Sequence, residues 1–318
     1  MIYAGIDIGG TTIKSGLMDG DTGKLLADMS CPFPLARGVT GTAEDIRRSV
    51  DSLCAEIGIA PDSLGGIGVC VPGSISPDMS MVLDAYNLGF HNAPLKAEVE
   101  KLFPGQTVML GNDADIAAMA ELNNGVFTGH KTAILLTLGT GLGGGIILNG
   151  KIFRGGNGNG VEPGHFIVDM HGDLVCTCGS RGCAETLCAA TWLINRGKDL
   201  VCNDPQGLVA KRAEGDPDKV NARLVIDCAR EKDPGAEQVF DTYLDSLSTV
   251  IASLIALFDP EVIGIGGGVS GAGEFLLAPL RQRVKEKNFF KKEYKIVRAE
   301  HGNTAGMIGA ATLAKVGY

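Results

Sequence analysis

Aromatic residues and positive charge are both scarce in this chain of 318 residues. Aromatic side chains make up 5% of the sequence, and 28 lysines and arginines face 37 acidic residues, which gives a formal net charge of −9. A nucleic-acid surface needs a local excess of Lys and Arg, because it must neutralise phosphates. The charge balance therefore argues against a nucleic-acid partner, while it leaves room for a small pocket that binds one phosphorylated ligand.

Export and membrane signals are also missing. The first stretch, MIYAGIDIGG, has no basic segment followed by a long apolar one, so we expect no signal peptide. No apolar run reaches the roughly 18 residues that a membrane-spanning helix needs. Most of the nine cysteines stand singly in apolar stretches, where cysteine usually serves as a small buried hydrophobic residue. We therefore expect a protein of the reducing cytoplasm with no membrane partner.

Strand and helix patterns alternate along the chain, which predicts an α/β protein. We expect helices over 42–58 (capped by Thr40 or Thr42), over 95–103, directly after Asn112–Asp113, and over 235–257, 273–287 and 304–316. We expect strands over 1–8, 12–19, 24–30, 107–110, 261–266 and 294–298. The segment 155–185 is irregular, apart from a short strand expected over FIVDM (166–170).

Two glycine-rich segments share one plan of strand, glycine turn and second strand. They are YAGIDIGGTTIKSGLMDG and ILLTLGTGLGGGIILNGK, and their similarity suggests two related halves. Neither is a dinucleotide fingerprint, because that motif must open a helix, and neither has the Gly-Lys-Ser/Thr of a P-loop. Each could be an ordinary hairpin, or its backbone N–H groups could cradle phosphate oxygens.

Asp7 favours the phosphate interpretation for the first of these loops. Its carboxylate alternates with Ile6 and Ile8 in an apolar strand, a costly position unless the charge is paired or binds a cation. A carboxylate beside a phosphate cradle is what a magnesium–nucleotide complex requires. Lys14 could neutralise phosphate charge, or it could be a solvated strand residue.

Three cysteines stand close together in LVCTCGSRGCAET, at positions 176, 178 and 183. Three thiols cannot all pair, no C-x-x-C redox motif is present, and a reducing compartment disfavours a disulfide. Zinc would need a fourth ligand. His165 lies eleven residues before Cys176, His171 is an alternative in the expected turn, and Cys188 is a weaker candidate. A set of one histidine and three cysteines is closed, which is typical of structural zinc.

Polar residues follow the buried strand at 107–110. Asn112 and Asp113 are good helix caps, but the carboxyl edge of a strand in an α/β sheet is also where ligands bind. Glu162 lies in the glycine-rich loop GNGNGVEPGH, and Glu185 follows the last cysteine of the cluster. Carboxylates and amides of this kind suit the hydroxyl groups of a sugar ring.

The first glycine loop, DIGGTTIK, resembles the D-x-G-G-T-x-x-K phosphate motif of the ROK family (repressors, open reading frames and sugar kinases). Further blocks follow in that family's order between residues 3 and 314: GVCVPGSI, YNLGFHNAPL, GNDADIAAMAE, LTLGTGLGGGIILNGKIFRGGNGNGVEPGH, CTCGSRGCAET and GNTAGMIGAATLA. Residues 190–255 carry no such block. Tyr86 and Phe90 stand where many members have Pro and Trp.

The resemblance implies a two-domain α/β fold of the actin/hexokinase-like (ribonuclease H-like) type with a central cleft. A smaller domain of residues 1–112 plus 303–318 would carry the first phosphate loop. A larger domain of residues 113–302 would carry the second phosphate loop, the zinc loop and an adenosine-side loop. The family commonly forms dimers, so a homodimer is expected.

The resemblance also implies roles for individual residues. Asp113 would be the catalytic base, and Asp7 would hold Mg²⁺, through water. The sugar-binding set would be Asn87, Asn112, Asp113, Glu162, His165 and Glu185. The ATP-binding set would be Asp7, Gly9, Gly10, Thr11, Thr12, Lys14, Gly139, Thr140, Gly141, Gly143, Gly267 and Gly268. Structural Zn²⁺ would be bound by His165, Cys176, Cys178 and Cys183.

The implied activity is ATP-dependent phosphorylation of a hexose in carbohydrate metabolism, with glucose and its 6-hydroxyl as the first expectation. N-acetylmannosamine, allose, fructose and β-glucosides are alternatives. A sugar-sensing regulator without catalysis is the alternative of another class. Repressors of the family carry a winged helix before the phosphate motif, which here begins at Asp7, so we expect a kinase.

Overall fold

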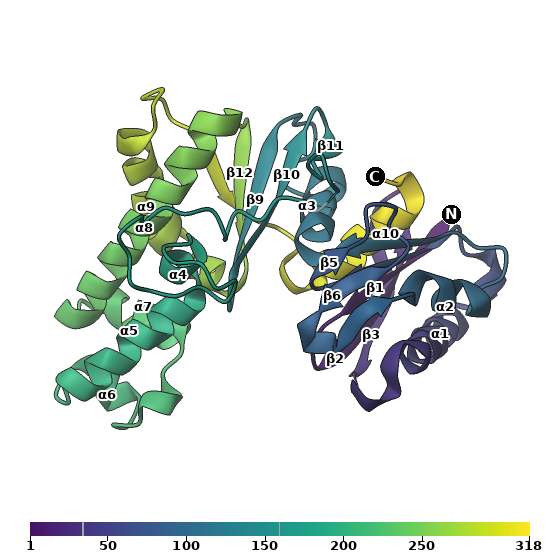
Figure 1. The fold of residues 1–318 in the computed structure, drawn as a ribbon, viewed down its shortest axis with the longest axis horizontal. Coiled ribbons are helices and arrows are strands. Elements are labelled where there is room, and N and C mark those ends of the chain that lie inside the picture. Colours follow the sequence, from purple (N-terminus) through teal and green to yellow (C-terminus); the bar gives the residue numbers. More distant parts are fainter. Residues whose placement is uncertain (34, 159) are drawn as a thin grey trace. The chain divides into compact units, whose positions relative to one another are not determined.

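The computed structural model describes residues 1–33, 35–158 and 160–318. They form two compact units (Figure 1): an amino-terminal unit of residues 1–131, 145–161 and 300–318, and a second unit of residues 132–144 and 162–299. The expected division ended the first domain at residue 112. The units differ from it because α3 (Asp113–Asn124) packs on α10 (Ala305–Val316) within the first unit.

The amino-terminal unit is built on a five-stranded sheet with the order β3-β2-β1-β4-β8. β1 (Ile2–Ile8), β2 (Thr12–Asp19) and β3 (Leu25–Pro32) form an antiparallel meander, and β4 (Ile67–Val71) and β8 (Val108–Asn112) run parallel to β1. Apolar side chains such as Ile6, Val69 and Leu110 are fully buried in its core. The register aligns Asp7 with Cys70 and Cys70 with Gly111, so these positions form a row across three strands.

Helices α1 (Gly38–Ile57), α2 (Leu95–Leu102) and α10 complete this unit, together with α3. Glycines let α10 lie directly on the sheet. A Cβ atom at Gly5 would lie 1.8 Å from the carbonyl oxygen of Met307, and one at Gly68 would lie 1.8 Å from that of Ala310. A small antiparallel sheet of β5 (Ser74–Ile75), β6 (Val82–Ala85) and β7 (Phe90–Ala93) was not expected from the sequence.

A second five-stranded sheet has the order β11-β10-β9-β12-β13. Its strands are β9 (Ala133–Leu138), β10 (Leu142–Leu148), β11 (Lys151–Ile152), β12 (Val262–Gly266) and β13 (Lys295–Arg298), and β9, β12 and β13 are parallel. The helices of the second unit are α4 (Glu185–Cys188), α5 (Ala190–Asn203), α6 (Leu208–Arg212), α7 (Ala222–Arg230), α8 (Pro234–Phe258) and α9 (Glu274–Lys287).

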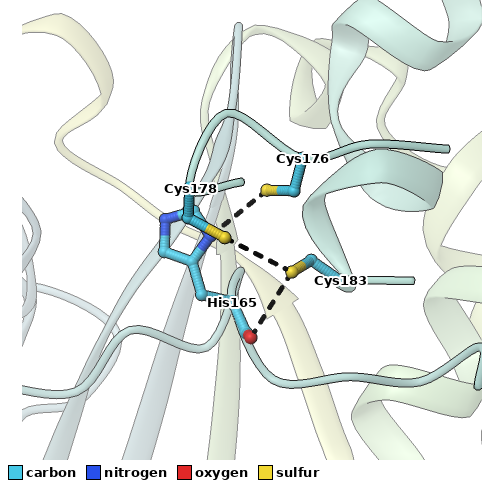
Figure 2. A group of neighbouring side chains, drawn as sticks. All are labelled: His165, Cys176, Cys178 and Cys183. Atoms are coloured by element: carbon cyan, nitrogen blue, oxygen red, sulfur yellow. Dashed lines mark hydrogen bonds between the residues drawn. The ribbon is translucent and has the colours of Figure 1, made fainter. Parts of the chain in front are cut away.

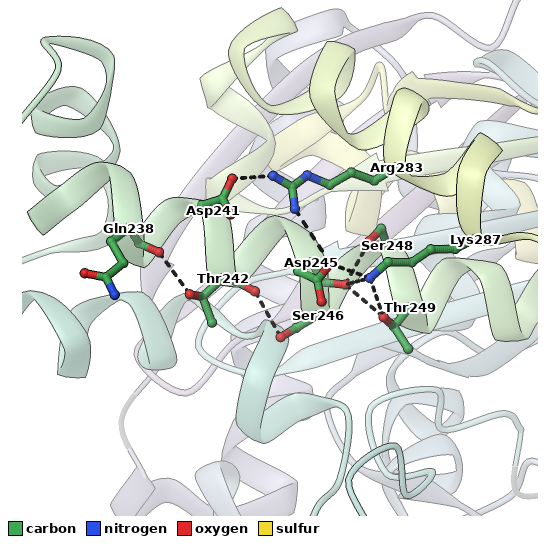
Figure 3. A network of polar contacts seen from close by, with 9 residues as sticks. All are labelled: Gln238, Asp241, Thr242, Asp245, Ser246, Ser248, Thr249, Arg283 and Lys287. Carbon is green, nitrogen blue, oxygen red and sulfur yellow. Dashed lines mark hydrogen bonds and ion pairs between the residues drawn. The ribbon is translucent and has the colours of Figure 1, made fainter. Parts of the chain in front are cut away.

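Helix α8 is long and apolar enough to cross a membrane, and no other helix among the described residues is. It packs against α4, α5, α7 and α9, and half of its apolar window is buried in the unit. Its polar face pairs with α9 (Figure 3): Lys287 Nζ lies 2.6 Å from Asp245 Oδ1 and 2.8 Å from Thr249 Oγ1, and Arg283 binds Asp241. These contacts are those of an internal helix of a folded unit.

The expected helices at 95–103, 235–257, 273–287 and 304–316 are confirmed within two residues. The expected cap of α1 is wrong: the helix begins at Gly38, and the Thr42 hydroxyl donates back to the Gly38 carbonyl within the first turn. The strand expected over 166–170 is also wrong. That segment makes only an isolated bridge between Ile167 and Cys183, because its partner residues belong to the irregular cysteine loop.

Candidate active site

The first glycine loop is a tight turn between β1 and β2. The Gly9 N–H donates to the Thr12 carbonyl at 2.8 Å, which leaves Gly10 and Thr11 exposed at the tip. Asn87, in the 3₁₀ turn Tyr86–Leu88, lies beside this loop, since a Cβ atom at Gly10 would be 3.4 Å from the Asn87 Cβ. The structure thus brings one expected sugar-binding residue to the expected phosphate loop.

Asp7 lies at the end of β1, and its side chain is 22% exposed. Lys14 Nζ is 3.7 Å from Asp7 Oδ2, and Cys70 is the paired residue on the neighbouring strand. Burial raises the pKa of the Asp7 carboxyl above its ordinary value, and Lys14 and Cys70 act in the opposite direction. Gly306, in the first turn of α10, leaves room for this carboxylate, because a Cβ there would lie 2.5 Å from Asp7 Cγ.

Asn112 and Asp113 form the junction between β8 and α3. The Asn112 side chain caps the helix: Oδ1 accepts the N–H groups of Ala114 at 2.9 Å and Asp115 at 3.4 Å, while Nδ2 donates to the Gly73 carbonyl at 2.9 Å. Asp113 is the first helical residue, and its Oδ1 also accepts the Ala114 N–H. The capping interpretation is therefore confirmed for Asn112, and the same geometry fixes Asp113 at the carboxyl end of a parallel strand.

Tyr86 and Phe90, which stand where many family members have Pro and Trp, differ in burial. Tyr86 is 81% exposed. Phe90 is buried and packs edge-to-face on Phe33, with ring centroids 6.1 Å apart. Phe90 is therefore a core residue of the amino-terminal unit.

In the second unit, the other glycine loop connects β9 to β10. The Gly139 N–H donates to the Gly141 carbonyl at 3.0 Å, and the Thr191 hydroxyl donates to the Thr140 carbonyl at 2.6 Å. Gly143 lies within β10. Gly267 follows β12 with φ 76°, a left-handed conformation that favours glycine.

The second unit contains a cavity of ≈ 590 Å³ that is lined by several of the expected nucleotide-binding residues. A cavity of ≈ 440 Å³ in the amino-terminal unit is lined by none of the expected site residues. The wall of the cavity in the second unit includes Gly139 and Thr140 from the glycine loop and Gly268 from the turn after β12. Arg223, Asp227 and Arg230 of α7 line it as well. Residues expected at the phosphates and at the adenosine thus share one cavity.

Glu162 and Glu185 occupy different surroundings in the second unit. Burial raises the pKa of the Glu162 carboxyl, His165 lowers it, and Glu185 raises it further. Glu185 is held on both oxygens: Oε2 accepts the Leu142 N–H at 3.0 Å, and Oε1 accepts the Thr177 hydroxyl at 3.0 Å. The carboxylate of Glu185 therefore joins the second glycine loop to the cysteine loop.

His165, Cys176, Cys178 and Cys183 converge on one point (Figure 2), with their ligand atoms all within 4.8 Å of one another. Cys178 Sγ and Cys183 Sγ are 3.7 Å apart, and His165 Nδ1 is 3.4 Å from Cys176 Sγ. Zinc–ligand bonds of about 2.3 Å to sulfur and 2.0 Å to nitrogen give tetrahedral edges of about 3.5–3.8 Å. These two separations match the edges of a tetrahedral zinc site, and one imidazole with three thiols is a donor set that zinc prefers.

The two alternative ligands lie elsewhere. His171 is exposed in a turn, where its main-chain N–H donates to Asp169 Oδ1. Cys188 is fully buried at the end of α4, and burial raises the pKa of its thiol. Neither belongs to the group of converging ligand atoms found among the described residues.

Sequence reasoning missed the residues that hold the expected ones in place. Cys70 and Gly306 border Asp7, Thr177 and Leu142 hold Glu185, and the Tyr318 hydroxyl lies against Gly111 at the end of β8. Thr177 lies only eight residues before Glu185, but the other contacts join segments far apart in the sequence, where no local spacing could indicate them.

The model of the ROK family matches residues 3–316. The glucokinase of Thermotoga maritima is 35% identical over 98% of this chain and 96% of its own length. The N-acetylgalactosamine kinase AgaK of Shewanella sp. is 31% identical over 98% of this chain and 96% of its own.

Among solved structures, a ROK family glucokinase from Streptomyces griseus in complex with glucose and AMPPNP is similar over the full length of both chains. It is 32% identical and has a TM-score of 0.83. This likeness confirms the expected actin/hexokinase-like fold. The chain therefore belongs to the ROK family, whose model it matches over residues 3–316.

Proposed function

We propose that this protein is an ATP-dependent glucose kinase that phosphorylates the 6-hydroxyl of the sugar. The main structural support is the pair Asn112–Asp113. The Asp113 carboxylate lies at the carboxyl end of a parallel strand, and the helix cap made by Asn112 anchors it there. Relatives named glucokinase match nearly the whole chain at 33–35% identity. The proposed function therefore combines a positioned base with full-length similarity to sugar kinases.

Asp113 acts as the general base in this proposal. Its carboxylate accepts the proton of the attacking sugar hydroxyl as that oxygen approaches the γ-phosphorus of ATP in line. The cap made by Asn112 limits how far this first helical residue can move, so the base is preorganised.

Each unit contributes its own further residues. In the amino-terminal unit, Gly9, Gly10, Thr11 and Thr12 bind phosphate oxygens, Lys14 neutralises charge, and Asp7 would hold Mg²⁺ through water. Asn87 and Asn112 bind sugar hydroxyls. When bound, the magnesium ion neutralises charge on the transferring phosphates. In the second unit, Gly139, Thr140, Gly141 and Gly143 bind phosphates, Gly267 and Gly268 border the nucleoside, and Glu162, His165 and Glu185 bind the sugar.

We also propose that His165, Cys176, Cys178 and Cys183 hold a structural Zn²⁺. Four protein ligands close the coordination sphere, so the ion would take no part in phosphoryl transfer. Ligation through His165 Nδ1 would leave Nε2 as a donor toward a sugar hydroxyl. The ion would thereby fix the segment from Glu162 to Glu185.

A panel of sugars tests the substrate. Purified protein with Mg²⁺ and ATP is given glucose, N-acetylmannosamine, allose, fructose and N-acetylgalactosamine, the last because of the relative that carries that name. ADP release reports turnover, and coupling to glucose-6-phosphate dehydrogenase reports the 6-phosphate. If kcat/KM is highest with glucose, the proposal is supported. If it is clearly higher with another sugar, that sugar takes the place of glucose as the proposed substrate.

Substitution of Asp113 tests the mechanism. Asp113→Asn should lower kcat by about 10²–10⁴-fold, the usual contribution of a general base, while the melting temperature changes little. A variant that keeps more than about a tenth of the activity would remove Asp113 from this role. Light scattering on the same samples tests the expected homodimer.

A further inference from the structure

Tyr318 packs inside the amino-terminal unit, against the end of strand β8. Its ring lies on a cluster of buried side chains that includes Cys70, Ile116 and Leu313. A Cβ atom at Gly111 would lie 2.8 Å from the Tyr318 hydroxyl oxygen, so the hydroxyl reaches the backbone of β8 itself. Gly111 directly precedes Asn112, so the hydroxyl lies beside the main chain that leads into Asp113.

Arg154 lies over the Tyr318 ring. The guanidinium carbon lies 4.6 Å from the ring centroid, a cation–π contact. The same guanidinium donates to the Gly158 carbonyl at 3.0 Å and to the Pro77 carbonyl at 3.4 Å. Arg154 is thus held by the segments of Pro77 and Gly158 while it lies over the Tyr318 ring, and this gives the phenol hydroxyl a defined position.

The phenol therefore lies against the end of β8, next to Asn112, the residue whose side chain caps α3. Asn112 caps that helix through Ala114 and Asp115, so a shift of its main chain would move the first turn. The ring also packs on the cluster that contains Cys70, the residue paired with Asp7 across β4 and β1. Burial raises the pKa of the Tyr318 phenol well above its ordinary value, so it stays protonated at neutral pH.

We propose that Tyr318, held by Arg154, is a positioning residue that sets the place of Asp113 through the main chain of Asn112. The proposal rests on the proposed function, in which Asp113 is the base. Tyr318 need not touch either substrate. Removing its hydroxyl should therefore slow the chemical step and leave substrate binding nearly unchanged.

The test compares Tyr318→Phe with Tyr294→Phe. Tyr294 also makes a hydroxyl contact, to Asp259, but in the second unit and at an exposed carboxylate. Loss of the hydroxyl beside Gly111 and Asn112 should lower kcat about three- to tenfold, with KM for glucose and for ATP within about twofold of wild type. Tyr294→Phe should leave both parameters unchanged.

Hydrogen–deuterium exchange gives a readout that does not depend on activity. In Tyr318→Phe the amides of residues 112–115 should exchange faster, and they should be unchanged in Tyr294→Phe. If Tyr318→Phe fails to fold, Arg154→Met serves instead, since it keeps the phenol and removes its support. The same kcat loss and faster exchange are then expected.

An unchanged kcat with unchanged exchange, or a rise in KM without a fall in kcat, would overturn the positioning role. Failure of the proposed function looks different. In that case wild-type protein does not phosphorylate glucose, or Asp113→Asn stays active, whatever the exchange of residues 112–115 shows.

Discussion

The carboxylate of Glu185 accepts the main-chain N–H of Leu142 at 3.0 Å, at the point where the second glycine loop enters β10. Its other oxygen accepts the Thr177 hydroxyl, between two of the converging cysteines. Gly141 makes the approach possible, because a Cβ there would lie 2.3 Å from Glu185 Oε2. One side chain thus fixes the cysteine loop and the expected phosphate loop relative to each other.

Glu185→Ala should therefore impair both substrates. Loss of hydrogen bonds to a charged group, worth about 1.5–3 kcal/mol, should lower kcat/KM by about 10- to 100-fold, and KM for ATP should rise together with KM for glucose. Glu185→Gln keeps an acceptor for Leu142 and should be milder. Steady-state kinetics with each substrate varied would check this. A change confined to the glucose KM would show that Glu185 binds sugar without supporting the phosphate loop.

Metal analysis should find about one zinc per chain in protein purified without chelators. Cys178→Ser should lose most of that zinc, because it removes one of four ligands, whereas Cys202→Ser, at an exposed cysteine on α5, should keep it. Stripping the metal should also lower the melting temperature, since an ion bound only by the folded state stabilises it. Wild-type protein with well under one zinc per chain would count against the site.

Gly306→Ala should disturb the proposed magnesium position. The added Cβ would lie 2.5 Å from Asp7 Cγ, and overpacking of about 1–3 kcal/mol should displace the carboxylate. We expect a fall in activity of about 5- to 100-fold that higher Mg²⁺ partly relieves, measured as initial rate against Mg²⁺ concentration. Gly309→Ala is the control: its Cβ would meet the Ile116 carbonyl, so it should lower stability without changing the magnesium dependence.

Glu121 should matter for stability. This buried carboxylate ties the end of α3 to the start of the carboxyl-terminal segment, with Oε1 accepting the N–H groups of Glu300 at 2.8 Å and His301 at 2.9 Å. Glu121→Ala should cost about 2–4 kcal/mol, because it leaves these donors without their charged acceptor. Chemical denaturation would measure it. Glu56→Ala, on the exposed face of α1, should change the free energy of unfolding by less than about 0.5 kcal/mol.

The cysteine cluster shows how much of the candidate site the sequence could predict. Its three cysteines lie within eight residues, and the choice of the fourth ligand among His165, His171 and Cys188 depended on how the chain folds back. The turn at Gly9–Thr12 was equally readable, because period-two apolar patterns and glycines act locally. The cap of α1 was misplaced for the opposite reason: Thr42 satisfies its hydroxyl within the helix, a choice that packing makes.

The sequence by itself determined the set of chemical groups: a carboxylate in a buried strand, an Asn–Asp pair at a strand end, two glycine turns and a thiol cluster. These features depend on neighbours along the chain, where spacing and local hydrogen bonding decide the outcome. Only the tertiary structure decided that Tyr318 lies against the end of β8, that Gly306 admits Asp7, and that Glu185 reaches Leu142. Such contacts join distant segments through backbone atoms and the absence of a Cβ, which leave no periodic signal in the sequence.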